Sequence, residues 1–400
     1  MKDAYICIIF LMKIMRNSIL LLFVVFLGVV SCREKITTPD RSNQTVFMYM
    51  PWTTNLTSYL EQNITDFESA VKQNILKKER VLVFFATSPQ EATLFELKYE
   101  NGTCVRKTYK SYNTPAYTTS GWITSVLEDV KTIAPAKRYA MIVSGHGTGW
   151  LPVSKVKIYP AVPKYHWDVE GVPLTRFFGG LAAAYQTEIP ALAQGISDAG
   201  LKMEYILFDN CYMSTIEVAY DLKDVADYLI ASPAEIMAYG FPYHWVAPYL
   251  VGNVDYYSIC NGFYTFYQNY STPCGTIAVT NCAEIDALAA VMKEINGQYS
   301  INTSLLNSIQ PLDGYRPVIF YDFGDYVSKL CPDHNLLERF DAQLERTVPF
   351  GLRMHTPTYY TALMGGQIPI EAYSGITISD PSLNPMATAK NETAWYKATH

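Results

Sequence analysis

The chain has 400 residues, of which 49% are hydrophobic and 17% charged, so it can bury a sizeable core and is not intrinsically disordered. Its formal net charge is −6 and it has no run of Lys or Arg, which argues against nucleic-acid binding because phosphate contacts need clustered basic side chains. With neither internal repeats nor low-complexity segments, this length indicates one large domain or two smaller ones.

The N-terminus is typical of a bacterial lipoprotein signal. Basic residues precede an apolar run over residues 19–30, and the small residues before Cys32 fit a cleavage site at which that cysteine would be lipidated. The competing interpretation, an uncleaved membrane anchor, is disfavoured because about 12 apolar residues are too few to span a bilayer. We therefore expect residues 1–31 to be removed, Cys32 to carry a lipid anchor in the cell envelope, and residues 32–44 to form a tether.

From residue 45 onward, apolar strand patterns alternate with amphipathic helix patterns. The patterns predict strands over 45–50, 80–86, 94–99, 104–109, 139–143, 205–208, 228–232, 276–280 and within 359–379, and helices over 55–76, 121–134, 182–199 in two short pieces, 284–299 and 336–348. This alternation implies an α/β fold, with a mostly parallel sheet covered by helices. We expect residues 45–274 to form the main domain and residues 275–400 a C-terminal α+β subdomain packed on it.

One predicted strand leads directly to a cysteine. Residues 205–208 are apolar, Asp209 and Asn210 interrupt the run, and Cys211 follows before a helical pattern with Ser214 as a plausible N-cap. The ends of parallel strands face the crevice in which open α/β sheets place their chemistry. Cys211 is therefore predicted to be a reactive thiol, although an isolated cysteine is more often a small buried hydrophobe.

A histidine occupies the matching place on another strand. The apolar run 139–143 opens into a glycine-rich turn that carries His146 between Gly145 and Gly147. Neighbouring parallel strands would bring His146 close to Cys211, and a thiol needs such a base to form the thiolate. Because the glycines let a substrate carbonyl approach main-chain amides, the Gly147 amide is a candidate oxyanion donor.

The two motifs together resemble those of the clostripain-like cysteine peptidases, which are relatives of gingipain, legumain and caspases. The first motif is the His-Gly of Ser144-Gly-His-Gly-Thr-Gly-Trp150, and the second is the Asp-x-Cys of Phe208-Asp-Asn-Cys-Tyr-Met-Ser214. Each motif follows an apolar strand. Other stretches carry the same likeness, at 231–243, 321–326 and 373–378. The resemblance extends from about residue 45 to near the C-terminus, and it implies a caspase-like fold with a Cys-His dyad.

The sequence departs from the family pattern at two places. Residues 51–56 stand where relatives often carry an Ala-Asp-Asn-like run, and Asn210 and Tyr212 replace the commoner small and apolar neighbours of the nucleophile. These departures affect the details of the pocket and remove no catalytic residue.

Acidic side chains near the nucleophile suggest basic substrates. Asp209 lies two residues before Cys211, so the alternation along a strand puts both side chains on one side. The resemblance implies that such an acid binds a Lys or Arg before the scissile bond. Glu235, in a loop expected to form a pocket wall, is a second candidate, and a capping or solvated role is the alternative for each carboxylate.

The segment 151–176 is rich in Pro, Lys and Tyr and lacks periodicity, so we expect an exposed loop. Relatives are often cut between the His and Cys segments, and the resemblance therefore implies self-cleavage here. Lys155, Lys157 and Lys164 are the candidate sites. The alternative is that the loop is only a lid.

The sequence thus predicts a monomeric, envelope-anchored cysteine endopeptidase that cleaves peptides or proteins after Arg or Lys. The alternatives are an acyl-transferring, ligase-like enzyme of the same fold and a catalytically silent binding lipoprotein. The remaining cysteines lack zinc spacing, and we expect no cofactor and no metal site, but calcium dependence stays open because some relatives need calcium. Cys260 and Cys274 could pair in an oxidising compartment, which sequence does not decide.

Overall fold

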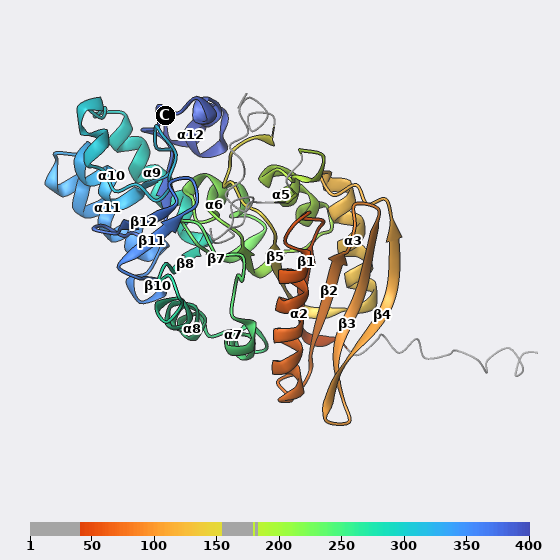
Figure 1. Ribbon diagram of the computed structural model, residues 1–400. Helices are drawn as coiled ribbons and strands as arrows, with labels where there is room; N and C mark the ends of the chain where they lie inside the picture. Colours follow the sequence, from red (N-terminus) through yellow and green to blue (C-terminus); the bar gives the residue numbers. More distant parts are fainter. Residues whose placement is uncertain (1–40, 154–178, 181–182) are drawn as a thin grey trace, which may run out of the picture. The chain divides into compact units, whose positions relative to one another are not determined.

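A nine-stranded sheet organises the computed structural model, which describes residues 41–153, 179–180 and 183–400 (Figure 1). Its strands are ordered β10-β8-β7-β6-β5-β1-β2-β3-β4. They are β1 (Ser42–Met50), β2 (Glu79–Ala86), β3 (Glu91–Glu100), β4 (Thr103–Asn113), β5 (Ala136–Ser144), β6 (Met203–Asp209), β7 (Ala226–Ala231), β8 (Thr276–Asn281) and β10 (Arg353–His355). The five central strands, β7-β6-β5-β1-β2, are parallel to one another. Each outer strand pairs antiparallel with its inner neighbour in the sheet.

Helices cover both faces of this sheet, as its apolar strands require. The helices are α2 (Thr57–Lys72), α3 (Ser120–Ile133), α5 (Ile189–Asp198), α6 (Ile216–Leu222), α7 (Tyr243–Leu250), α8 (Tyr256–Gln268), α9 (Ile285–Asn296), α10 (Phe323–Leu330), α11 (His334–Thr347) and α12 (Ala394–Thr399). Alternate residues of β1 face opposite layers: Val46 and Met48 pack in the core with α2, α7 and α8, whereas Phe47 and Tyr49 pack in the core with α3 and α5. The predicted mostly parallel, helix-covered sheet is therefore confirmed.

The region after residue 275 adds to the same sheet. Ser42–His400 forms one compact unit, and both β8 and β10 come from beyond the expected subdomain boundary. This region also contains the hairpin of β11 (Thr358–Thr361) and β12 (Gly366–Pro369), and the short pair of β9 (Tyr321–Asp322) and β13 (Thr377–Ile378).

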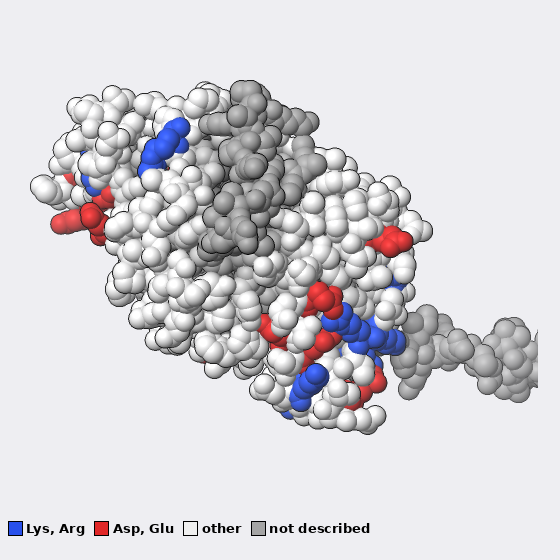
Figure 2. All heavy atoms as spheres, viewed as in Figure 1, with Lys and Arg blue, Asp and Glu red and all other residues white. Residues whose placement is uncertain are grey.

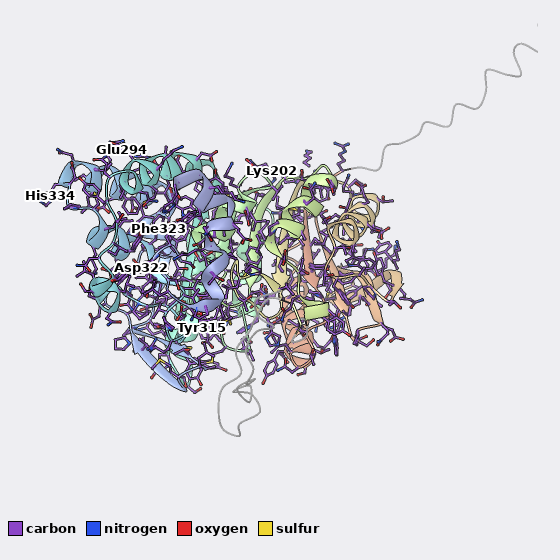
Figure 3. All side chains as sticks on the ribbon, turned by 90° about the horizontal axis from the view of Figure 1, so that it is seen from above. Lys202, Glu294, Tyr315, Asp322, Phe323 and His334 are labelled. Atoms are coloured by element: carbon purple, nitrogen blue, oxygen red, sulfur yellow. The ribbon has the colours of Figure 1, made fainter. Side chains whose placement is uncertain are left out.

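Two stretches that carry the family resemblance, 321–326 and 373–378, meet in this region. Asp322 and Phe323 are labelled in Figure 3, and Asp322 accepts hydrogen bonds from the backbone N–H of Ser374 at 2.6 Å and of Asp325 at 2.9 Å. The Thr377 N–H donates to the carbonyl of Ser214 at 2.9 Å. This pairing ties the C-terminal region to the segment that follows Cys211.

Three local predictions need correction. The helix after Cys211 has Thr215 as its N-cap, because the Thr215 hydroxyl accepts from the Val218 N–H at 3.2 Å, whereas the Ser214 hydroxyl donates to the Gly375 carbonyl at 2.8 Å. Helices α7 and α8 were not predicted, since α7 contains Pro248 and α8 is rich in aromatic residues with modest helix propensity. Helix α2 is shorter than the pattern over 55–76 suggested.

Other features bear on the remaining expectations. The thiols of Cys260 and Cys274 are free, so they do not form a disulfide. In the described part of the chain, no helix is long and apolar enough to cross a bilayer. Figure 2 shows a largely uncharged face on which basic and acidic side chains lie beside each other. The expected signal peptide, Cys32, Lys155, Lys157 and Lys164 lie outside the described residues.

Candidate active site

The ends of β5 and β6 place the candidate histidine and cysteine on neighbouring strands. The two strands are parallel, and their register pairs Ser144 with Asp209. His146 and Cys211 each follow two residues beyond this pair. The expectation that the two loops leave adjacent strands at the same edge of the sheet is therefore met.

The loops are in direct contact. The Asn210 side-chain amide donates to the His146 carbonyl at 3.2 Å. A Cβ atom added to Gly147 would lie 2.3 Å from the Cys211 carbonyl oxygen and 2.9 Å from the Cys211 nitrogen. Position 147 therefore cannot carry a side chain without separating the two loops, which gives a physical reason for the glycine beside His146.

His146 is buried and held from two sides. Its Nε2 lies 2.7 Å from the side-chain oxygen of Asn55, in the turn after β1, and its backbone N–H donates to the Gly179 carbonyl at 3.2 Å. Since an amide oxygen only accepts, Nε2 carries the proton, and Nδ1 is the basic nitrogen of the neutral ring. A base oriented by a third group in this way is the usual arrangement around an activated nucleophile.

Cys211 is fully buried, and its sulfur faces the backbone of Ile236. The thiol lies 3.6 Å from the Ile236 carbonyl, to which it can donate, and 3.3 Å from the Ile236 N–H, from which it can accept. The first contact suits the thiol and the second suits the thiolate, because a donor N–H stabilises negative charge on sulfur. The loop that contains Ile236 therefore provides a partner for either protonation state.

Tyr212, directly after Cys211, has a backbone conformation that non-glycine residues rarely adopt. Its φ is 59°, a left-handed value that costs on the order of 1–3 kcal/mol for a bulky side chain. The Tyr212 hydroxyl donates to Glu235 at 2.6 Å, and its ring stacks on Phe320 with a centroid distance of 5.1 Å. Burial raises the pKa of Tyr212 well above its ordinary value, so the hydroxyl stays a donor. These contacts hold a strained turn next to the thiol.

The two candidate substrate-binding acids are both buried beside this turn. Asp209 accepts from the Phe241 N–H at 3.1 Å and from the Tyr243 hydroxyl at 3.2 Å. Glu235 accepts from the Tyr212 hydroxyl and, with both oxygens, from the Ala362 N–H at 3.1 Å. The loop 233–243, expected to be a pocket wall, does lie against both Asp209 and Cys211.

Sequence reasoning missed three contributors: Asn55, Tyr212 as a strained and clamped residue, and the Ile236 backbone. The available signal was the departure from the family pattern, because Asn55 lies in the unusual run 51–56 and Tyr212 is the unusual neighbour of Cys211. Within the described residues, no group of three or more His, Cys, Asp or Glu side chains is arranged to hold a metal ion.

A caspase-like sheet with paired His-Gly and Asp-x-Cys loops defines the class of protein as a caspase-like cysteine peptidase. Residues 48–326 match the model of the clostripain family, and no curated protein sequence matches the chain. The chain belongs to the clostripain family of cysteine peptidases.

Solved structures agree with this assignment. The chain is 59% identical, with a TM-score of 0.84, to a secreted C11 cysteine protease from Bacteroides thetaiotaomicron, and the match covers 90% of this chain and 100% of that one. A clostripain from the same organism, solved with a peptide inhibitor, is 63% identical over 56% of this chain and 99% of its own, with a TM-score of 0.55. An inactive zymogen C11 protease from Parabacteroides distasonis is 27% identical over 90% and 99%, with a TM-score of 0.73.

Proposed function

We propose that this cysteine protease cleaves peptides after Lys or Arg, with Cys211 as nucleophile and His146 as its acid and base. The single observation that carries the proposal is the contact between the two loops at the ends of β5 and β6, where the ideal Cβ of Gly147 would overlap the Cys211 backbone. This close packing of the histidine loop on the cysteine loop supports a shared reaction centre, as a Cys-His dyad requires.

In the proposed reaction, the Cys211 thiolate attacks the scissile carbonyl and forms a tetrahedral intermediate, whose oxyanion accepts a hydrogen bond from the Gly147 amide. His146 gives its proton to the leaving amine as the C–N bond breaks, which leaves a thioester on Cys211. Water, deprotonated by His146, then attacks the thioester; the C–S bond breaks to release the carboxylic acid product, and His146 returns the proton to the Cys211 sulfur. Asn55 keeps the imidazole oriented through both steps by accepting from Nε2.

Preference for a basic residue before the scissile bond is assigned first to Asp209. It lies two residues from Cys211 and is buried, so its charge acts in a medium of low dielectric constant. The 63% identical clostripain was crystallised with the inhibitor BTN-VLTK-AOMK, whose peptide ends in Lys. Glu235, which is buried beside the same turn, is the second candidate.

We further propose that the chain is a lipid-anchored envelope protein that acts as a monomer and cuts itself between its His and Cys segments. The anchor rests on the sequence around Cys32, and the C11 relatives from B. thetaiotaomicron and P. distasonis are described as a secreted protease and a zymogen, respectively. Support for self-cleavage comes from the pairing of His146 with Gly179, which brings the chain back to the histidine after the loop 151–176. The two described residues that flank this segment, His146 and Gly179, therefore lie side by side at the proposed reaction centre.

The direct test uses a short peptide amide with Lys or Arg before the scissile bond, followed by mass spectrometry with and without an added amine nucleophile. We expect hydrolysis by the wild type and none by Cys211→Ala or His146→Ala. When two residues act as a unit, removing either one removes nearly the whole rate enhancement. Transfer to the amine would identify a ligase-like enzyme. Near wild-type turnover in either variant would refute the dyad.

A further inference from the structure

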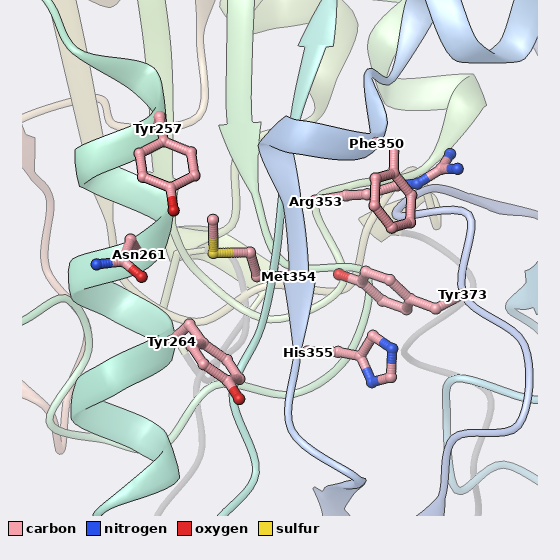
Figure 4. Close-up of a pocket in the computed structure, with 8 residues that line it drawn as sticks. All are labelled: Tyr257, Asn261, Tyr264, Phe350, Arg353, Met354, His355 and Tyr373. Atoms are coloured by element: carbon pink, nitrogen blue, oxygen red, sulfur yellow. The ribbon is translucent and has the colours of Figure 1, made fainter.

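A pocket outside the catalytic centre lies between α8 and β10. Figure 4 shows it, lined by side chains of α8, by residues 350–355 before and within β10, and by Tyr373 from a later loop. Its volume is about 340 Å³, at the lower end of the roughly 300–1,000 Å³ that small-molecule sites occupy. No catalytic or substrate-binding candidate lines it.

The α8 side of the pocket is a single stripe of the helix. Tyr257, Asn261 and Tyr264 are spaced four and three residues apart, which puts them on one face. The face of α8 turned away from this stripe is buried and includes Ile259 and Phe263. The stripe is therefore not needed for packing of the helix, and Tyr257 is 56% exposed.

Aromatic faces also line the other side. Phe350 is 74% exposed, and Tyr373 keeps its ring at the pocket while its hydroxyl donates to the Ile277 carbonyl at 3.0 Å. Large exposed rings that gather around one hollow are unusual on a soluble protein and mark a binding surface more often than scattered ones do. The pocket thus offers flat apolar faces on two sides.

Arg353 is the guanidinium of the pocket lining, and neighbouring groups of the chain engage most of it. It donates to the carbonyls of Val348 and Ser374 at 3.2 Å, lies 3.4 Å from a Glu345 carboxylate oxygen, and sits over the Phe350 ring at 5.6 Å from its centroid. The Nδ1 of His355 lies 2.8 Å from the Thr356 carbonyl, which only accepts, so Nε2 of the neutral ring is an acceptor. Asn261 adds a neutral amide. The lining has no acidic side chain to bind a cation, and an anion would compete with Glu345 for the Arg353 guanidinium.

An added peptide strand is a poor occupant. Although β10 is the last strand of the sheet, it has only three residues, and very short edge strands resist pairing with a further strand. A neutral ligand with both apolar C–H faces and hydroxyl groups fits the lining better, because the rings take its faces while the amide and the imidazole take its hydroxyls. A sugar ring has this chemistry.

We propose that this pocket binds a neutral saccharide, such as a hexose or N-acetylhexosamine unit. His355 lies at the same edge of the sheet as Cys211, since β10 is parallel to β7 and β6. Three strand spacings separate β10 from β6, a distance of roughly 15 Å, which about five extended residues would span. A glycan on a protein substrate could therefore occupy the pocket while its polypeptide lies at Cys211, an extension that rests on the proposed function.

Binding is tested without proteolysis, by saturation-transfer NMR of the full chain with cellobiose, maltose, mannobiose and N,N′-diacetylchitobiose at millimolar concentration. We expect at least one to bind, and Tyr257→Ala and Phe350→Ala each to weaken binding about tenfold while small-peptide hydrolysis is unchanged. Tyr249→Ala is the matched control, because Tyr249 is an exposed ring, at 40%, on α7 and outside the pocket. Absence of binding by all four sugars, or equal loss in the control, would overturn the proposal.

A second measurement addresses the use of the site and depends on protease activity. A Lys peptide with one sugar about five residues from the scissile bond should have a lower KM than the same peptide without it, and Tyr257→Ala should remove the difference. If the sugar binds but KM is unchanged, the pocket binds saccharide independently of the proposed substrate path, and only the link to proteolysis is lost. If neither peptide is cleaved, the proposed function fails and the binding result stands alone.

Discussion

At the scale of single residues, Asn55 is the side chain that most directly controls the histidine. We expect Asn55→Ala to lower kcat by roughly 10²-fold with little change in KM, because displacing a catalytic base by about 1 Å lowers the rate by about that factor. Asn55→Asp keeps the acceptor for Nε2 and should retain more activity. The added carboxylate favours the imidazolium, so the alkaline limb of the pH–rate profile should move to higher pH. A uniform loss in both variants with an unchanged profile would mean that Asn55 is merely structural.

Gly147 is predicted to tolerate no side chain. Gly147→Ala should reduce activity at least 10²-fold while the protein stays folded, because the new Cβ would meet the Cys211 carbonyl at 2.3 Å and push the loops apart. Gly121→Ala is the control, since a Cβ at that helical glycine meets nothing within 4 Å. Rates with a Lys peptide and circular dichroism spectra make the comparison. Full activity in Gly147→Ala would show that the loops are not held as described.

Asp209 is expected to determine preference for basic substrates. A charge-assisted contact with a substrate cation is worth roughly 2 kcal/mol, so Asp209→Asn should reduce the ratio of Lys or Arg cleavage to Leu cleavage by tens-fold. Glu235→Gln keeps an acceptor for the Tyr212 hydroxyl and should change this ratio less. A positional-scanning substrate set measures both. If neither variant loses selectivity, another group forms the pocket.

At the scale of elements, a buried pair of acids joins α6 to the C-terminal region. Glu217 accepts from the Ser379 N–H at 2.7 Å, and Trp150, on the histidine loop, donates to the Ser379 hydroxyl at 2.9 Å. In the described part of the chain, one Glu217 oxygen and both Asp380 side-chain oxygens are buried without a hydrogen-bond partner. Burial, and then the charge of Asp380, raises the pKa of Glu217 to about 8, and burial raises the pKa of Asp380 to about 7.

These raised pKa values predict lower stability at higher pH. A folded carboxyl that holds its proton more tightly than the unfolded one stabilises the protein fully below the unfolded pKa, and this contribution is lost as pH rises to about 8. We expect Tm to fall between pH 5 and pH 8.5. Glu217→Gln should flatten that slope, whereas Glu91→Gln, an exposed control, should not. A Tm that rises over this range, or the same slope in Glu217→Gln, would contradict the assignment.

At the scale of the whole molecule, self-cleavage is expected to produce two associated fragments. Intact-mass analysis should find two pieces of wild type that co-purify without a covalent link, and a single chain for Cys211→Ala. Strands on both sides of the loop 151–176 belong to one sheet, with β5 before it and β6 after it, so the fragments should stay together. Replacing Lys155, Lys157 and Lys164 with Gln should block the cut if these sites are right. A wild type that stays intact while it cleaves peptides at full rate would refute activation by this route.

The sequence by itself determined the features that depend on short stretches of chain. Apolar runs before Cys211 and His146 predicted two strands with a reaction centre at their ends, because strand periodicity and glycine turns are local properties. Most element positions followed for the same reason. The exceptions are α7, which contains Pro248, and α8, whose many aromatic residues have a higher propensity for strands than for helices, so packing decided the outcome.

Only the tertiary structure decided which groups complete the site. Asn55 reaches His146 across 91 positions, and Ile236 reaches Cys211 across 25, and neither spacing leaves a periodic signal. The same holds for the α8 and β10 pocket, whose two sides lie far apart in the sequence. A contact between distant segments depends on strand order and register, which are set by the packing of the whole sheet and not by any local pattern.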